Sequence, residues 1–216
     1  MTPDILINGI SMAGLGWIRE SIDFPAPEPQ METITVPGRN SPIRYTEALG
    51  RVSYEPRSFE VVLTMLGNRN AYNQMAELLI NSFQGQLVKV ICSEEPELYS
   101  YGTIKVVSSY DPKEGRGEAV ISTSDADSYR YHIDDTTITI QGTAQAKLMN
   151  DYMPVIPKVT TTKETTLRWK IGTDAFEKTV SAGTWEFPEL ELTSGENTVS
   201  VTSEGVTTFM FKEGRL

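Results

Sequence analysis

The sequence has few of the residues that most enzymes depend on. Its 216 residues include one cysteine, Cys92, and one histidine, His132. A single cysteine excludes a disulfide within the chain, and a single histidine excludes a metal site built from several histidines. Catalytic acid–base chemistry most often uses histidine, so the sequence offers little for it.

Basic residues are also scarce. There are 19 Lys and Arg residues against 29 Asp and Glu residues, which gives a formal net charge of -10. A surface of this sign repels the phosphates of nucleic acids and of anionic lipids. The composition therefore disfavours a nucleic-acid-binding protein and a membrane-surface protein.

Long apolar runs are missing as well. No stretch reaches the length that a membrane-spanning helix needs, and we expect no membrane insertion. The first residues, MTPDILINGISMAGLGW, carry an acid where a signal peptide has its basic residues. We therefore expect synthesis in a cytoplasm, without export.

No catalytic or cofactor motif is found. The sequence contains no phosphate-binding glycine loop, nucleophile elbow or zinc-protease signature. His132 precedes Asp134 and Asp135, but a histidine at a strand end beside solvated carboxylates is more common than a base or a metal ligand. Cys92 lies in an apolar run and is expected to be a buried thiol. We predict no catalytic residue, no metal site and no cofactor.

Most of the chain alternates apolar and polar residues, which is typical of β-strands. The clearest strand is expected at 59–65, where Phe59, Val61, Leu63 and Met65 share one face. Further strands are expected at 87–92, 103–107, 118–122, 129–133 and 136–141. The pattern predicts a mainly β fold built from antiparallel sheets or sandwiches.

One segment has helical periodicity. Apolar residues recur at helical spacing after Asn70, which we expect to cap the helix, and Gly85 is expected to end it. The apolar residues concerned are Ala71, Met75, Leu78, Leu79 and Phe83. We expect this α-helix to pack on the first β domain.

A change of composition near residues 150–166 predicts a domain boundary. Pro154 and Pro157 precede the polar stretch TTTKETT. We assign 1–150 to an N-terminal domain and 151–216 to a small C-terminal β-sandwich. In the second domain, Trp169 and Trp185 lie in alternating runs that suit core residues, although aromatic faces also stack on sugar rings.

Two segments do not have the pattern of a core. Residues 24–30, FPAPEPQ, carry proline at every second position, so they are expected to be extended. They form either an arm that clamps a neighbouring molecule or a surface loop. Residues 111–117, DPKEGRG, are expected to form a hairpin tip that meets a partner.

Three stretches resemble the distal tail proteins of long-tailed, non-contractile phages. They are Val36-Pro37-Gly38-Arg39-Asn40, Tyr45-Thr46-Glu47-Ala48-Leu49-Gly50 and Tyr54-Glu55-Pro56-Arg57-Ser58-Phe59, in this order. Upstream, Trp17 and Arg19 resemble the first strand of that family. Near the end, LELTSGENT at 190–198 and FMFKEGRL at 209–216 resemble its C-terminal domain, so the resemblance covers nearly the whole chain.

The resemblance implies an N-terminal β domain with one helix, which closes into a hexameric ring (the belt), and a C-terminal galectin-like β-sandwich. It implies a structural protein of the virion, at the phage tail tip or baseplate, assembled in the host cytoplasm and acting in host attachment. The expected partners are other copies of the chain, the major tail protein, the tape measure protein and the hub, lysin or receptor-binding proteins. DNA would pass through the lumen without specific binding. The residues expected at the subunit interface are Trp17, Arg19, Pro37, Gly38, Arg39 and Arg57.

Other readings remain open. The first alternative is a carbohydrate-binding module that contacts the host cell wall through Trp169 and Trp185 of the C-terminal sandwich. A surface adhesin outside any phage is a weaker one because an export signal is missing. An enzyme comes last, because no residues support it. Arg39 and Arg57 also have an alternative to an interface role, since each can form an ion pair with a nearby acid of the same chain.

Overall fold

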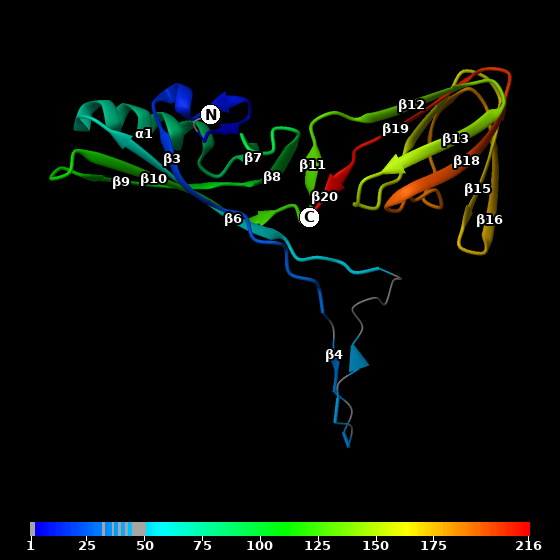
Figure 1. Ribbon diagram of the computed structural model, residues 1–216, viewed down its shortest axis with the longest axis horizontal. Helices are drawn as coiled ribbons and strands as arrows, with labels where there is room; N and C mark the ends of the chain where they lie inside the picture. The colour runs from blue at the N-terminus through cyan, green and yellow to red at the C-terminus, as the bar shows by residue number, and fades with distance from the viewer. Residues whose placement is uncertain (1–2, 32, 36, 39, 42, 45–50) are drawn as a thin grey trace. The chain divides into compact units, whose positions relative to one another are not determined.

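The computed structural model describes residues 3–31, 33–35, 37–38, 40–41, 43–44 and 51–216. The chain divides into two compact units, Met1–Arg130 and Tyr131–Leu216 (Figure 1). Each unit has its own buried cluster of apolar side chains. The prediction of a mainly β fold is confirmed, and a single α-helix is present in the described part of the chain.

The first unit contains two antiparallel sheets. One has the strand order β2-β1-β7-β8 and the other has the order β3-β6-β10-β9. The bounds are β1 Ile5–Ile7, β2 Ile10–Ser11, β3 Ile18–Asp23, β6 Arg57–Leu66, β7 Leu87–Cys92, β8 Leu98–Thr103, β9 Lys105–Asp111 and β10 Arg116–Ala126. A 3-10 turn, η1 (Ala13–Leu15), follows β2.

Strand β6 illustrates why the alternating pattern is reliable. Phe59, Val61, Leu63 and Met65 are all buried, as expected, and lie on the face that contributes to the core. Ser58 before them and Glu60 between them are exposed. Burial of one face fixes the register of the strand, because a shift of one residue would expose every apolar side chain.

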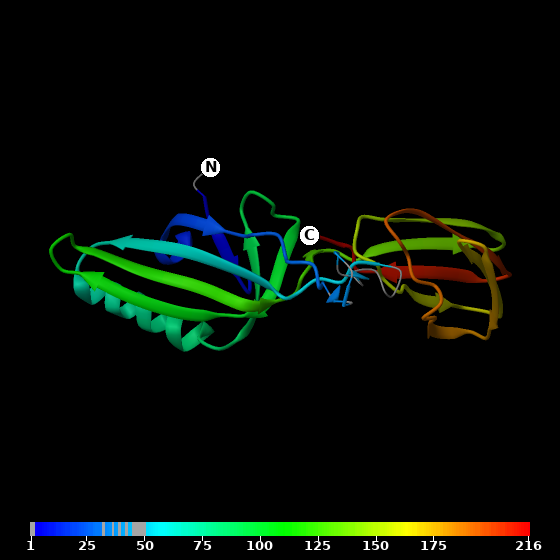
Figure 2. The same cartoon turned by 90° about the horizontal axis from the view of Figure 1, so that it is seen from below.

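Helix α1 (Arg69–Phe83) lies along β9 and β10 (Figure 2). The helix was predicted, but its cap differs: Asn68, not Asn70, accepts a hydrogen bond from the Ala71 amide at 2.9 Å. Its buried face consists of Tyr72, Ala76, Leu79 and Phe83. Leu78, which was assigned to that face, is 42% exposed. The buried residues recur three or four positions apart, and Leu78, directly beside Leu79 in the sequence, points to another side of the helix.

The close contact between α1 and the sheet depends on a glycine. Gly117 on β10 lies under the Tyr72 ring, and a Cβ atom at this position would be 2.0 Å from Tyr72 Cδ2. The Tyr72 hydroxyl donates a hydrogen bond to the Glu118 carbonyl at 3.2 Å. Glycine is therefore required here by space, because any side chain would push the helix away.

The second unit is a sandwich of two four-stranded antiparallel sheets (Figure 1). Their orders are β12-β19-β14-β17 and β13-β18-β15-β16. The bounds are β12 Thr136–Gln141, β13 Ala144–Asn150, β14 Lys158–Thr161, β15 Thr165–Ile171, β16 Asp174–Val180, β17 Gly183–Glu186, β18 Gly195–Ser203 and β19 Val206–Phe211. Two further short strands are β11 (Arg130–His132) and β20 (Gly214–Arg215).

The boundary differs from the expected one at 150/151. Strands β12 and β13, which were assigned to the first domain, pair along their lengths with β19 and β18. Their apolar side chains Ala146 and Leu148 belong to the core of the sandwich. Residues 131–150 therefore belong to the second unit, since strand partners far away in the sequence decide which core a strand joins.

Candidate interaction surfaces

Sheet β3-β6-β10-β9 of the first unit has one face in the core and one face that carries polar and charged side chains. Directly opposed residues share a face, so the register places Ser21, Val62, Val120 and Val107 in one row on the second face. Val107 is 50% exposed. We call this second face the outer face of the sheet.

The outer face is more acidic than basic. On it, Glu20 accepts hydrogen bonds from Arg116 and from the Thr64 hydroxyl. The strand register adds four acids and one base to the same face. They are Asp23, Glu60, Asp111, Glu118 and Lys105. Five carboxylates against two cations give the outer face a formal charge of -3.

Between residues 28 and 55, the described parts of the chain form a narrow antiparallel ribbon. The Gln30 amide donates to the Ser53 carbonyl and the Glu55 amide donates to the Glu28 carbonyl, each at 2.8 Å. Strands β4 (Thr33–Ile34) and β5 (Ile43–Arg44) pair further along it. Met31 and Ile34 are 66% and 51% exposed. An isolated two-stranded ribbon with exposed apolar side chains gains stability when another surface covers it.

Of the predicted motif at 36–40, Pro37, Gly38 and Asn40 are among the described residues of this ribbon. Pro37 and Gly38 are exposed, and Gly38 has a φ of +83° with no atom within 4 Å of a Cβ position. The glycine is therefore needed by the turn and not by a close contact. Arg39, which was assigned to the interface, lies outside the described residues.

The hairpin tip expected at 111–117 is present between β9 and β10. Arg116 is opposite Asp111, and the Asp111 carboxylate accepts from the Lys113 amide at 2.7 Å. The Gly115 carbonyl accepts from the Gly67 amide at 3.1 Å. Residues 111–114 are exposed. The tip is thus anchored at its base and open at its end.

Two of the predicted interface residues make their contacts within their own unit. The Trp17 side chain is 1% exposed and meets the Tyr72 ring edge-on at 6.0 Å. Arg19 forms a bidentate ion pair with Glu94, with 2.8 Å between Nη1 and Oε2. This hydrogen-bonded pairing lowers the pKa of Glu94 to about 2. Both side chains therefore support the core of the first unit.

Arg57 lies at the start of β6, where the ribbon ends. Its side chain is 2% exposed, and its Nε and Nη2 atoms have no hydrogen-bond acceptor among the residues that the structure describes. Desolvation lowers the pKa of its guanidinium, and the nearby positive charge of Arg130 acts in the same direction. Sequence reasoning singled out the residue but not its burial.

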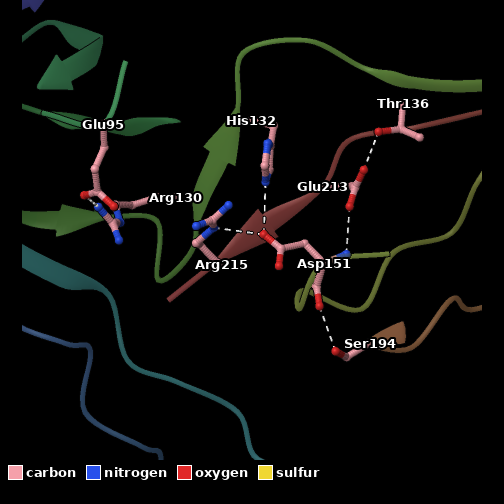
Figure 3. A network of polar contacts seen from close by, with 8 residues as sticks. All are labelled: Glu95, Arg130, His132, Thr136, Asp151, Ser194, Glu213 and Arg215. Carbon is pink, nitrogen blue, oxygen red and sulfur yellow. Dashed lines mark hydrogen bonds and ion pairs between the residues drawn. The ribbon is translucent and has the colours of Figure 1, made fainter. Parts of the chain in front are cut away.

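A polar network near the end of the chain was not predicted. Asp151 Oδ2 contacts His132 Nε2 at 3.0 Å and accepts from Arg215 Nε at 2.9 Å (Figure 3). The hydrogen bond with His132, together with the charge of Arg215, lowers the pKa of Asp151. The resemblance at 209–216 pointed to this segment, but not to its partners.

Glu213 completes the network. One of its carboxylate oxygens accepts from the Asp151 amide at 2.7 Å, and the other accepts from the Thr136 hydroxyl (Figure 3). The Ser194 hydroxyl donates to the main-chain carbonyl of Asp151 at 2.7 Å, and not to His132. The geometry therefore joins four segments of the second unit and does not align a serine with a base.

The two tryptophans assigned to a glycan platform lie in different sheets. Trp169 on β15 is 4% exposed, stacks on Phe176 at 5.6 Å, and donates to the Glu189 carbonyl at 3.0 Å. Trp185 on β17 is 37% exposed and donates to the Ser181 carbonyl at 3.1 Å. Trp169 thus has the core position that its alternating run suggested.

The second unit also carries a groove of about 950 Å³ over sheet β13-β18-β15-β16. Its polar lining includes Gln145, Arg168, Glu177 and Ser200. Arg168 and Glu177 form a bidentate pair, with 2.9 Å between Nε and Oε2. Sequence analysis did not find this groove, because its side chains come from four strands.

Cys92 is half-buried, and its burial raises its pKa to about 11. The thiol is therefore protonated at neutral pH and is a poor nucleophile. In the described part of the chain, no group of three or more His, Cys, Asp or Glu side chains is placed to hold a metal ion. No helix in that part is long and apolar enough to cross a membrane.

No protein-family model matches the chain, and a search of curated proteins gives no significant match. Among solved structures, the chain is similar to the Dit protein (gp 19.1) of phage SPP1, described as a paradigm of the hub adsorption apparatus in phages that infect Gram-positive hosts. The TM-score is 0.74 at 14% sequence identity, and the match covers 100% of both chains. Over its whole length, the chain therefore has the fold of a phage distal tail protein.

Proposed function

We propose that the chain is a structural protein of a phage tail tip, six copies of which form a ring between the tail tube and the hub or adsorption apparatus. The observation that carries this proposal is the structural similarity over the full length of both chains, across both units. The role is geometric and requires no turnover. The ring docks on the major tail protein, surrounds the tape measure protein and holds the hub or receptor-binding proteins.

Sheet β3-β6-β10-β9 supplies a means of closure. Its two edge strands are β3 and β9. If one copy joins its β9 side to the β3 side of the next, the contact is head-to-tail, and such contacts close into a ring when the rotation between neighbours divides a full turn. Closure also protects sheet edges that would otherwise bind other chains.

The outer face of this sheet suits the wall of a channel. It carries a formal charge of -3 per copy, from five carboxylates and two cations, so six copies supply -18. DNA phosphates are repelled by such a wall, which favours passage without binding. The ribbon at 28–55 is the candidate clamp on the neighbouring copy, because Met31 and Ile34 are exposed on it.

Negative-stain imaging of the assembled protein tests the proposal. Rings with six equal subunits and an open centre are expected. Closed particles without a channel would refute the conduit role. Purified tail tips labelled with an antibody against the chain should carry the label below the last tail-tube ring.

A further inference from the structure

The groove over sheet β13-β18-β15-β16 contains a straight row of hydrogen-bonding side chains. The strand register places Gln145 opposite Ser200, Ser200 opposite Arg168, and Arg168 opposite Glu177. Directly opposed residues share a face, so the row crosses all four strands. It presents an amide, a hydroxyl, a guanidinium and a carboxylate in order.

The Arg168–Glu177 pair sets the chemistry of this row. Its two hydrogen bonds, at 2.9 and 3.1 Å, fix both planar groups, while the side chains remain 58% and 54% exposed. A guanidinium and a carboxylate held side by side offer N–H donors and oxygen acceptors to the same ligand. Pairs of neighbouring hydroxyl groups, which both donate and accept, match this arrangement.

The length of the row and the charge of the groove restrict the class of ligand further. Three interstrand spacings make the row about 14 Å long, the length of a short oligosaccharide. The groove is lined by two cations and three carboxylates, so it does not favour a polyanion. These residues are Arg168, Lys170, Glu177, Glu191 and Glu196. Ile171 is 41% exposed and lines the groove, where it can cover an apolar C–H face.

We propose that this groove binds a neutral oligosaccharide across the row Gln145–Ser200–Arg168–Glu177. The row uses other side chains than the Trp169 and Trp185 platform: Trp169, which also lines the groove, is only 4% exposed, and Trp185 lies in the other sheet. It belongs to the second unit and does not depend on ring formation. Its side chains stand on paired strands, which hold a binding site more rigidly than loops do.

The test uses the full chain on an array of neutral oligosaccharides of glucose, galactose and N-acetylhexosamines, with heparin fragments as polyanions. Titration calorimetry then gives the affinity for the neutral oligosaccharide that binds best. The double variant Arg168→Gln, Glu177→Gln should bind it at least tenfold more weakly, because charge-assisted hydrogen bonds are lost.

The matched control is the double variant Lys178→Gln, Glu189→Gln. It removes another ion pair of the same unit, with 3.3 Å between Nζ and Oε1, whose residues do not line the groove. Its affinity should stay within about twofold of the unmodified chain. Equal melting temperatures for both variants exclude unfolding as the cause. The proposal is overturned by an array without any neutral ligand, by binding to heparin fragments alone, or by equal affinities of the two variants.

Discussion

Gly117 shows how one residue fixes the contact between helix α1 and its sheet. Replacing Gly117 with Ala would place a Cβ atom 2.0 Å from Tyr72 Cδ2, so the helix must shift. We expect a loss of about 2–3 kcal/mol in the free energy of unfolding, the upper range for overpacking. Chemical denaturation of Gly117→Ala and of the unmodified chain gives this difference in the free energy of unfolding.

Gly14→Ala is the control for this prediction. Gly14 has no positive φ, and its Cβ would lie 3.3 Å from the Ser11 hydroxyl oxygen, so a shift of only a few tenths of an ångström makes room for it. We expect a change within about 1 kcal/mol. Equal effects of the two substitutions would contradict the role of the Tyr72 contact.

The Arg19–Glu94 pair predicts part of the acid sensitivity. The pKa of Glu94 is about 2 in the folded chain against an ordinary value of 4.5. A lowered folded pKa stabilises the fold above pH 4.5, and this stabilisation is lost as the pH falls from 4.5 to about 2. Since the Glu94 side chain is 53% exposed, we expect only about 1 kcal/mol.

Glu94→Gln should therefore lower the stability at pH 7 and leave it nearly unchanged near pH 2. Thermal unfolding followed between pH 2 and 7 gives both values. A difference between the two proteins that stays constant over this range would show that the ion pair is not responsible.

At the scale of elements, the Glu213 network predicts that the last residues hold the second unit together. Glu213→Ala leaves the Asp151 amide and the Thr136 hydroxyl without their acceptor. Unsatisfied donors cost about 1–3 kcal/mol. Hydrogen exchange should rise at residues 131–136 and 151–153, whereas Glu204→Ala, at an exposed site, should leave it unchanged. Unchanged exchange in Glu213→Ala would rule out the network as the link.

The ribbon predicts a separation of folding from assembly. Gln30 and Ser53 are hydrogen-bonded across it, so a short Gly-Ser linker can replace residues 31–52 without straining the first unit. We expect an unchanged melting temperature but no rings, because the proposed clamp is missing. Rings of normal size from this variant would remove the ribbon from the interface.

Elements were predictable where the pattern was local. Strand β7 matched its predicted range, and the buried face of β6 matched residue by residue, because alternation along one strand reports burial directly. The helix cap and the unit boundary were displaced. Asn68 and Asn70 are chemically equal candidates, and the partners of β12 and β13 lie about 50 residues or more further along the chain.

The candidate sites were less predictable for the same reason. Trp17 and Arg57 stood out in the sequence, but their burial at 1% and 2% follows from packing that no local pattern shows. The groove unites Gln145 with residues from three other strands. A sequence read along the chain does not bring them together.

At the scale of the whole molecule, two units with separate cores suit a ring with projecting domains. The first unit has a sheet with two edge strands and an acidic outer face, and the second unit has the groove. We therefore propose that the first unit forms the wall of the channel and that the second unit binds a ligand in its groove. The resemblance of the sequence to distal tail proteins and the shared fold with the SPP1 protein both support the ring that we propose.

The most direct test is the mass of the purified protein in solution, measured by light scattering over a concentration series. If the chain builds a sixfold ring, a species of six chains, six times 24.0 kDa or 144 kDa, forms as the concentration rises. A mass of 24.0 kDa at every concentration, also after addition of the major tail protein, would contradict it.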